Sequence, residues 1–148
     1  MRCNIIDVTL LADQHLIAER NELRFIPPLL NKKYLKQGLN LQKDIPMKYC
    51  LGTGHMNFWL NKMLYLENRY QEITNEMLSR NFKPDPSVIF DTTLAKQIGL
   101  YLDWEPKEQD YYTIARRIKE KLLLKVWWYK YRSKPITLDW INNIYGEA

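Results

Sequence analysis

The sequence predicts an all-α protein: a compact single domain of helices and irregular loops, built around one long central helix. Apolar residues make up 46% of the chain and only 5 of its 148 residues are glycine, a composition typical of a folded protein rich in helices. A chain of this length can bury a sizeable core as one domain. No segment alternates apolar and polar residues in the manner of a half-buried strand, and a stretch near the middle shows helical periodicity instead.

The first helix is expected over about residues 9–23, after an extended or irregular start. Asp7 or Thr9 can cap its first turn. His15 and Glu22 are seven positions apart and therefore share one face of this helix. Its core-facing residues are predicted on other sides: Leu10, Leu16, Ile17 and Leu23.

A second, shorter helix follows. Pro27 and Pro28 end the first segment, and proline is tolerated in the first turn of a new helix. We expect that helix over residues 28–37, stopped by Gly38. Residues 39–50 are interpreted as a loop.

The central helix is predicted over about residues 54–80. Apolar side chains recur there at spacings of three and four, the period of a helix with one buried face. The members of this stripe are Trp59, Met63, Leu66, Tyr70, Ile73 and Met77. We interpret the stripe as core; a groove for a cofactor or a partner is the alternative.

Three further segments follow the central helix: a loop rich in proline at 82–91, a short helix over 92–103, and a long helix over about 109–126. The inward face of the long helix is predicted to consist of Tyr111, Ile114 or Ala115, Ile118 and Leu122. An aromatic and basic stretch, WWYKYRSKP, and a tail at 136–148 complete the chain.

Composition excludes several classes of protein. Two cysteines, Cys3 and Cys50, are too few to form a disulfide framework in a chain of this size. The sequence contains no run of about 18 apolar residues, the length needed to span a membrane. Asp7, Asp13 and Glu19 interrupt any signal-peptide pattern. We therefore expect an intracellular, reduced compartment and no membrane partner.

The positive charge is concentrated in one window, from Ile114 to Lys134. This window holds eight Lys or Arg residues and one acid, a net +7, whereas the whole chain carries +5 and the remainder therefore −2. Trp127, Trp128, Tyr129 and Tyr131 lie in the same window. Cationic side chains neutralise phosphates and aromatic rings stack on bases, so the window favours a nucleic-acid partner. The alternative is a solvated helix face followed by aromatic residues packed in the core.

Metal and cofactor sites are not expected. The potential ligands Cys3, His15, Cys50 and His55 are not paired at C-x-x-C or H-x-x-x-H spacing. The segment LGTGH lacks the lysine of a P-loop. A Cys–His nucleophile is conceivable, but the local sequence does not support it.

Four blocks of sequence carry a resemblance to a known family. They are LADQHLIAE followed by NEL, then LGTGHMNFWLNKMLYL, then ARRIKEK, then WWYKY. In this order and spacing they resemble the pyrimidine-dimer DNA glycosylases, the phage-type endonuclease V family. The resemblance covers roughly residues 1–134, and the tail from Ile136 extends past it.

The resemblance implies that the α-amine of the N-terminal residue is the nucleophile and that Glu22 is its catalytic carboxylate. Counting back from LADQHLIAE puts Met1 at the place of the nucleophile. Because Met followed by Arg is a poor substrate for methionine removal, we expect Met1 to be retained. An α-amine has a pKa of about 7.7–8.0, so roughly a tenth of it is neutral near pH 7. The implied reaction removes a base through an imine and then nicks the strand by β-elimination, without a metal or cofactor.

Further residues are implied as contacts to double-stranded DNA that contains a lesion. Arg117 and Lys121 lie one helical turn apart, which suits adjacent phosphates. Arg2 and Asn4 match an arginine and an asparagine of the family, and Trp128 to Tyr131 match its aromatic-basic motif. The implied DNA-binding residues are Arg2, Gln14, His15, Arg24, Arg117, Lys121, Trp128, Tyr129 and Lys130. A bent duplex with a flipped-out adenine opposite the dimer and a monomeric protein are also expected.

The chain departs from the family at two positions. Asn21 and Phe25 stand where the resemblance places arginines that grip the DNA at the lesion. Arg20 or Arg24 could compensate. These departures leave two alternatives to a pyrimidine-dimer glycosylase: the same mechanism on another damaged or modified base, and a helical DNA-binding module without catalysis.

Overall fold

The structure, a computed structural model, describes residues 3–146; Met1, Arg2, Glu147 and Ala148 lie outside the described residues. Its elements confirm the prediction of an all-α fold, because helices form nearly all of the regular structure. In chain order they are η1 (Val8–Leu10), α1 (Asp13–Leu23), α2 (Ile26–Gln37), η2 (Gly38–Asp44), α3 (His55–Phe58), η3 (Trp59–Asn61), α4 (Met63–Ser79), α5 (Thr93–Ile98), α6 (Glu108–Leu124), β1 (Lys130–Tyr131), β2 (Lys134–Pro135) and α7 (Leu138–Tyr145).

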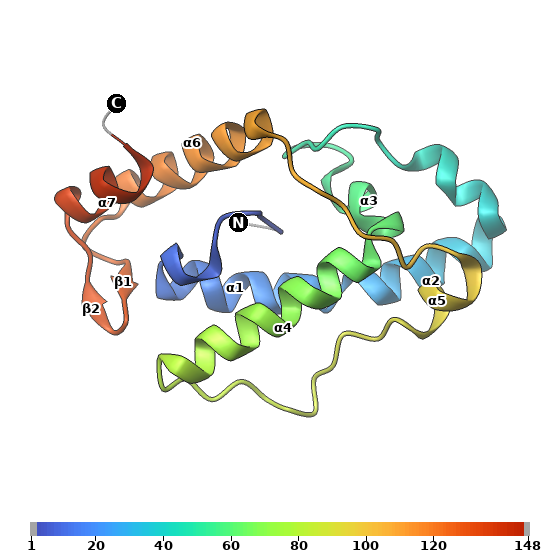
Figure 1. The fold of residues 1–148 in the computed structure, drawn as a ribbon, viewed down its shortest axis with the longest axis horizontal. Coiled ribbons are helices and arrows are strands. Elements are labelled where there is room, and N and C mark those ends of the chain that lie inside the picture. The colour runs from blue at the N-terminus through green and yellow to red at the C-terminus, as the bar shows by residue number, and fades with distance from the viewer. Residues whose placement is uncertain (1–2, 147–148) are drawn as a thin grey trace.

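Helix α4 packs against α1, and these two helices organise the rest of the molecule (Figure 1). Helix α2 packs against α5 on one side of this pair, and α6 packs against α7 on the other. The N-terminal segment runs between α6 and α4 (Figure 1). No helix within residues 3–146 is long and apolar enough to cross a membrane.

The predicted apolar stripe of the central helix is confirmed as core. All six of its side chains are buried: Trp59, Met63, Leu66, Tyr70, Ile73 and Met77. The prediction of one continuous helix was wrong, because the chain breaks at Lys62, whose φ of −126° and ψ of 39° are not helical. The break is stabilised from elsewhere, since the carbonyls of Leu100 and Leu102 accept bonds from the first amides of α4.

The first helix is shorter than predicted. Its expected first turn is the separate turn η1, and α1 begins only at Asp13 after an extended Leu11. Leu16 is fully buried as predicted, but Leu10 and Ile17 are 39% and 38% exposed, so their assignment to the core was wrong. The buried side of α1 holds polar residues in their place: Asp13, His15, Glu19 and Arg20.

Two predicted helix boundaries and one predicted core residue need correction. Helix α2 begins at Ile26, with Pro27 and Pro28 in its first turn. Amides of the first turn have no acceptor within the helix, so the N–H that proline lacks is not needed there. Helix α5 ends at Ile98 because Gly99 adopts a left-handed φ of 78°. Tyr111 of α6 is 42% exposed and does not face the core.

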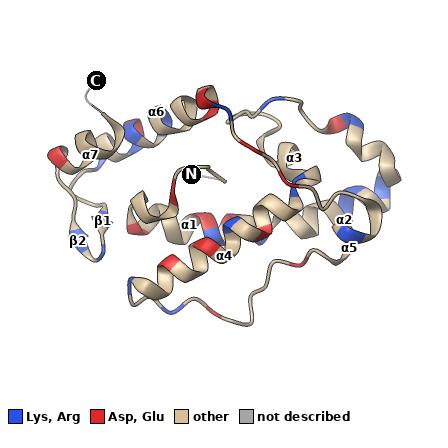
Figure 2. Ribbon diagram, viewed as in Figure 1, with Lys and Arg blue, Asp and Glu red and all other residues tan. Residues whose placement is uncertain are grey.

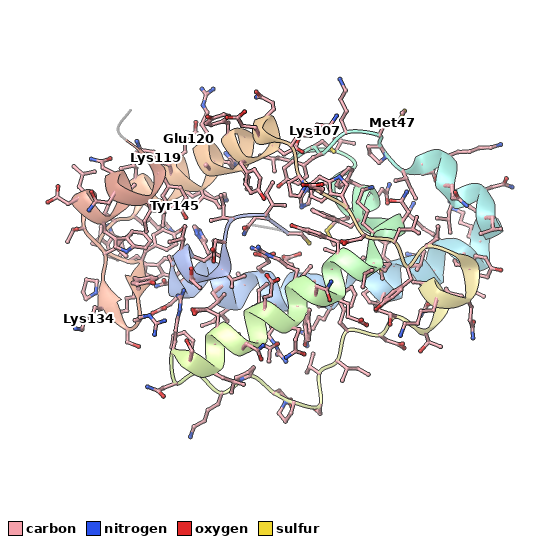
Figure 3. All side chains as sticks on the ribbon, viewed as in Figure 1. Met47, Lys107, Lys119, Glu120, Lys134 and Tyr145 are labelled. Atoms are coloured by element: carbon pink, nitrogen blue, oxygen red, sulfur yellow. The ribbon has the colours of Figure 1, made fainter. Side chains whose placement is uncertain are left out.

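The tail folds onto α6 as helix α7. Ile141 is fully buried, and the ring of Trp140 lies 5.3 Å from that of Tyr131, centre to centre. Lys119 of α6 donates to the carbonyl of Gly146 just after α7. Figure 3 labels Lys119 and Tyr145 in this region, with Lys134 at the outer edge of the β1–β2 hairpin. The tail thus stabilises both α6 and the hairpin.

Candidate active site

The predicted catalytic pair is Met1 with Glu22. Met1 and Arg2 lie outside the described residues. Glu22 is half-buried near the end of α1. Burial raises the pKa of the Cys3 thiol, and the negative charges of Glu19 and Glu22 raise it further. The Glu22 carboxylate is therefore close enough to the first described residue of the N-terminal segment to act on it electrostatically.

A buried arginine of α4 holds the N-terminal segment against α1. The Arg69 side chain makes a bidentate pair with Glu19, in which Nε and Nη2 donate to the two carboxylate oxygens at 2.8 Å each. Nη1 donates to the carbonyl of Ile6 at 2.6 Å, and Nη2 also donates to Asn4 Oδ1 at 2.9 Å. The backbone amide of Asn4 donates to Glu19 at 3.3 Å. We call these four residues the amino-terminal anchor.

The charges of the amino-terminal anchor support each other. Burial alone would lower the pKa of the Arg69 guanidinium, but the Glu19 carboxylate more than offsets this and the net direction is upward. Arg69 therefore remains charged inside the protein. Asn4 Nδ2 is buried without a hydrogen-bond partner among residues 3–146. The anchor fixes residues 4–6, the part of the chain that leads to the predicted nucleophile.

A second buried arginine, directly after the end of α4, acts at the other end of α1. Arg80 Nη1 donates to Asp13 Oδ1 at 2.9 Å and to the carbonyl of Leu11 at 2.8 Å. The Asp13 carboxylate also accepts the backbone amides of Arg132 and Ser133, at 3.0 and 2.7 Å. These amides form the turn between β1 and β2. We call Arg80, Asp13 and the two turn residues the hairpin anchor.

Two residues of α1 that were predicted to bind DNA contact the aromatic-basic segment of the protein itself. Gln14 Nε2 donates to the carbonyl of Trp128 at 2.7 Å, and its Oε1 accepts the amide of Lys130 at 3.0 Å. The His15 ring lies 4.9 Å from the ring of Tyr129, centre to centre. Contact of Gln14 and His15 with DNA stays a prediction.

His15 is buried and uncharged at neutral pH. Burial lowers its pKa to about 4, and the positive charge of Lys121 contributes in the same direction. Its Nδ1 has no hydrogen-bond partner among the described residues. The effect of Lys121 shows that this residue of α6 lies near α1, so α1 connects the N-terminal segment with part of the basic window.

Of the predicted DNA contacts on α6 and in the segment after it, three residues are exposed, one is half-buried and one is buried. Arg117 and Lys130 are exposed and Lys121 is half-buried. Trp128 is 45% exposed, whereas Tyr129 is buried beneath it. Figure 2 shows positive residues along α6 and in the hairpin, and acidic residues on α1 and α4. The residues able to contact phosphates and bases therefore lie on α6 and on the segment that follows it.

Neither departure from the family is compensated by Arg20. Asn21 and Phe25 are both exposed. Arg20 is buried and donates to Thr74 Oγ1 at 3.1 Å and to the carbonyl of Asp85 at 3.1 Å, so it fixes the loop after α4. The guanidinium of Arg24 is exposed and lies 4.8 Å from the centre of the Phe25 ring. Of the two candidates, Arg24 alone is placed to meet a ligand.

Sequence reasoning missed the acids and arginines of the two anchors, although a signal was present. Glu19 lies three residues after Leu16 and four before Leu23, at the spacing of the buried face of α1. Arg69 lies three residues after Leu66 and four before Ile73 in the same way. A charged residue at an apolar spacing indicates a buried charge that needs a partner.

The described residues include no group of three or more His, Cys, Asp or Glu side chains placed to hold a metal ion. The candidate site comprises Glu22 beside the anchored segment of residues 4–6, with a basic and aromatic surface attached to the same helix. Residues 1–90 match the family model for pyrimidine dimer DNA glycosylases. Since this match covers more than half of the chain, the protein belongs to the pyrimidine dimer DNA glycosylase family.

Proposed function

We propose that this protein excises cis-syn cyclobutane pyrimidine dimers from duplex DNA by forming an imine with the α-amine of Met1, and then cleaves the strand as an AP lyase. Membership in the family supports the glycosylase activity on DNA. The observation that supports the mechanism is the amino-terminal anchor, because Arg69 holds Asn4 and Ile6 beside the helix that carries Glu22. A nucleophile at the end of the chain requires such fixation to act at a defined distance.

In the proposed reaction, the neutral amine nitrogen bonds to C1′ of the damaged nucleotide as the bond from C1′ to the base breaks. The base leaves with the bonding electrons and takes up a proton. The proton taken up by the base comes from the nitrogen, which leaves a neutral secondary amine on C1′. The bond between C1′ and the ring oxygen then breaks as the nitrogen lone pair forms the C1′=N imine, and the second nitrogen proton passes to the ring oxygen as a hydroxyl. The imine acidifies the 2′ hydrogen; its removal expels the 3′ phosphate and nicks the strand. Hydrolysis of the imine releases the enzyme.

Glu22 is proposed to stabilise the positive charge that develops on the sugar and to relay protons during elimination. Arg2 is proposed to lower the pKa of the neighbouring amine, which raises the neutral fraction near pH 7. The two glutamates of α1 differ in burial, and we assign them different roles for that reason. Glu19 is fully buried and paired with Arg69, whereas Glu22 is half-buried and available to a substrate.

The DNA is proposed to lie along the basic surface with the lesion beside Trp128 and Lys130. Arg117 and Lys121 contact adjacent phosphates, and Trp128 stacks on an unpaired or distorted base. A nucleotide is flipped out of the duplex, which opens space for the amine to reach C1′. His15 and Gln14 contribute uncharged contacts, since the pKa of His15 is about 4.

Borohydride trapping tests the mechanism. An oligonucleotide duplex with one abasic site is incubated with the protein and sodium borohydride, and the covalent adduct is detected by electrophoresis and mass. We expect an adduct at Met1 that disappears on N-terminal acetylation or extension. No adduct, or one that survives blocking of the N-terminus, contradicts the proposed nucleophile. The intact mass of the protein establishes whether Met1 is retained.

Glu22→Gln tests the carboxylate. We expect base removal from a duplex containing a dimer to be abolished, with duplex affinity largely unchanged. Glu105→Gln, in an exposed loop, is the matched control. Loss of DNA binding in Glu22→Gln would instead assign Glu22 a structural role.

Two other functions stay open. Asn21 and Phe25 are exposed where the family resemblance places arginines, and this favours, as a second candidate, the same reaction on another damaged or modified base. A panel of duplexes with different lesions distinguishes the substrates by their rates of strand cleavage. A non-catalytic DNA-binding module would bind the same duplexes and form no borohydride adduct.

A further inference from the structure

We propose that Asp13 is a positioning residue for lesion recognition: it holds the β1–β2 turn so that the aromatic-basic segment, residues 127–134, keeps a fixed place relative to Glu22. The inference rests on the proposed function, in which this segment contacts the lesion. It assigns to a buried carboxylate, nine residues before Glu22 on the same helix, control over how well the protein distinguishes damaged from undamaged duplex.

The turn itself is unfavourable without support. Tyr131 pairs with Lys134, so the loop between the two strands has only two residues, Arg132 and Ser133. Both have positive φ angles, 50° and 68°. Two-residue hairpin loops of this kind prefer Asn-Gly or Gly-Gly, because other side chains are strained at positive φ. Local sequence preference therefore does not explain this hairpin.

Asp13 supplies the missing support. Its two carboxylate oxygens accept the amides of Arg132 and Ser133 separately, at 3.0 and 2.7 Å. The carboxylate is buried, and Arg80 neutralises it at 2.9 Å. Bonds from amides to a buried carboxylate are charge-assisted and stronger than bonds to a neutral acceptor. Asp13 thus offsets the strain at both positive-φ residues of the turn.

Neighbouring contacts fix the rest of the segment to the same end of α1. Gln14 bonds to the backbone of Trp128 and Lys130, on either side of the buried Tyr129. The hydroxyl of Tyr131 donates to the carbonyl of Thr9 at 2.7 Å. The backbone of the segment is therefore held while the Trp128 and Lys130 side chains stay exposed.

Helix α1 then sets the distance between recognition and catalysis. Asp13 and Glu22 are nine residues apart on one continuous helix, which corresponds to about 13 Å along its axis. A helix of this kind does not stretch, so a segment attached at Asp13 keeps its spacing to Glu22. Loosening the attachment leaves Glu22 and the N-terminal segment in place but lets the exposed aromatic side chain move.

The primary test is Asp13→Asn, which keeps the size of the side chain but replaces one acceptor oxygen by a donor. We measure the ratio of affinities for a duplex with a cis-syn dimer and the same duplex undamaged. We expect this ratio to fall by about tenfold, because small misplacements of positioning groups reduce performance by up to about 10²-fold. Borohydride trapping on an abasic duplex at saturating concentration should stay within about twofold of the unmodified protein.

Rescue distinguishes positioning from a general loss of stability. Adding Ser133→Gly to Asp13→Asn removes the strain of a positive φ at that residue. We expect the double variant to recover most of the lost discrimination. Asp91→Asn is the matched control, since its carboxylate also accepts a backbone amide, from Thr93, but contacts neither α1 nor the hairpin.

Ser133→Pro provides a second route that leaves the Arg80–Asp13 pair intact. Proline cannot adopt a positive φ and has no amide to donate to Asp13. We expect the same loss of discrimination with trapping retained. Unchanged discrimination in both Asp13→Asn and Ser133→Pro, or equal loss of discrimination and trapping, overturns the inference. If the unmodified protein forms no adduct at all, the imine mechanism fails, while the ratio of affinities still tests the role of Asp13.

Discussion

The two ends of α1 each hold an irregular segment through a buried ion pair, but the charges around the two pairs differ in how far they extend to the surface. At each end an arginine, Arg69 in α4 or Arg80 directly after it, pairs with an acid of α1. Each pair holds a segment that has little regular structure of its own. In the amino-terminal anchor the pair is bidentate and every partner of Arg69 is buried. In the hairpin anchor the charges extend to the surface, because half-exposed Arg132 approaches Glu76 at 3.6 Å. The segment that leads to the proposed nucleophile is therefore fixed more completely than the segment proposed to contact DNA.

Arg69→Met should have the largest effect, because it breaks the fully buried anchor. Glu19 would be left as an unpaired buried charge, which costs about 3–5 kcal/mol of unfolding free energy. Urea denaturation measures this change. Adding Glu19→Leu removes the unpaired charge, and we expect the double variant to be more stable than Arg69→Met alone. A double variant no more stable than the single one would show that the carboxylate is not the cause.

Arg80→Met should destabilise the protein less, by about 3 kcal/mol or somewhat below, near the low end expected for a broken buried pair. The acids near Arg80 keep other partners, since Asp13 retains two backbone amides and Glu76 retains Arg132. The comparison of urea midpoints between the two arginine variants tests the difference between the anchors. Equal losses would contradict it.

Lowering the pH should reduce the unfolding free energy through His15, which lies at the hairpin end of α1. In the unfolded chain its pKa is about 6.5, whereas burial lowers the folded value to about 4. As the pH drops below 6.5, the unfolded state takes up the proton before the folded state does. The free energy of unfolding therefore decreases as the pH is lowered, until about pH 4. The loss between pH 6.5 and 5 is at most about 2 kcal/mol.

His15→Phe isolates this contribution, because it keeps a ring against Tyr129 and cannot titrate. We expect its unfolding free energy to change less than that of the unmodified protein between pH 6.5 and 5. The carboxylates of the protein are common to both and cancel in the difference. Parallel pH profiles would show that His15 does not titrate on unfolding.

Tyr131→Phe should have the smallest effect, about 1 kcal/mol or less, the usual net worth of one hydrogen bond. It removes the bond from the Tyr131 hydroxyl to the carbonyl of Thr9, which still accepts Arg80 at 3.3 Å. Tyr70→Phe is the matched control, because its hydroxyl also donates to a carbonyl, that of Val88, outside both anchors. A loss of discrimination for dimers should appear in Tyr131→Phe and be absent in Tyr70→Phe.

The sequence predicts those features that depend on local patterns. The stripe from Trp59 to Met77 identifies the core face of the central helix, because helical periodicity is visible within a short window. The break at Lys62 is not predictable in this way, since its stabilising carbonyls belong to Leu100 and Leu102. The sequence pattern also predicts that Glu22 lies on the first helix, and Glu22 lies near the end of α1.

The burial of Glu19 and Arg69 has a signal in the sequence, but their pairing could not be predicted, for a related reason. Glu19 and Arg69 are separated by 50 residues, so each alone looks like an interruption of an apolar face. The turn of the β1–β2 hairpin lacks the Asn-Gly or Gly-Gly sequence typical of two-residue hairpin loops. Hydrogen bonds to Asp13, not the turn sequence, stabilise it. In both cases a buried charged residue stabilises a structure for which the neighbouring sequence shows no recognisable pattern.

The turn residues Arg132 and Ser133 have a consequence for the order of folding. Their bonds to Asp13 close loops of 119 and 120 residues, whereas those of Arg69 to Glu19 and Asn4 close loops of 50 and 65. Longer loops are slower to close. Residues 4–6 are therefore expected to reach their place on α1 and α4 before the hairpin docks. The hairpin then meets a surface that is already formed.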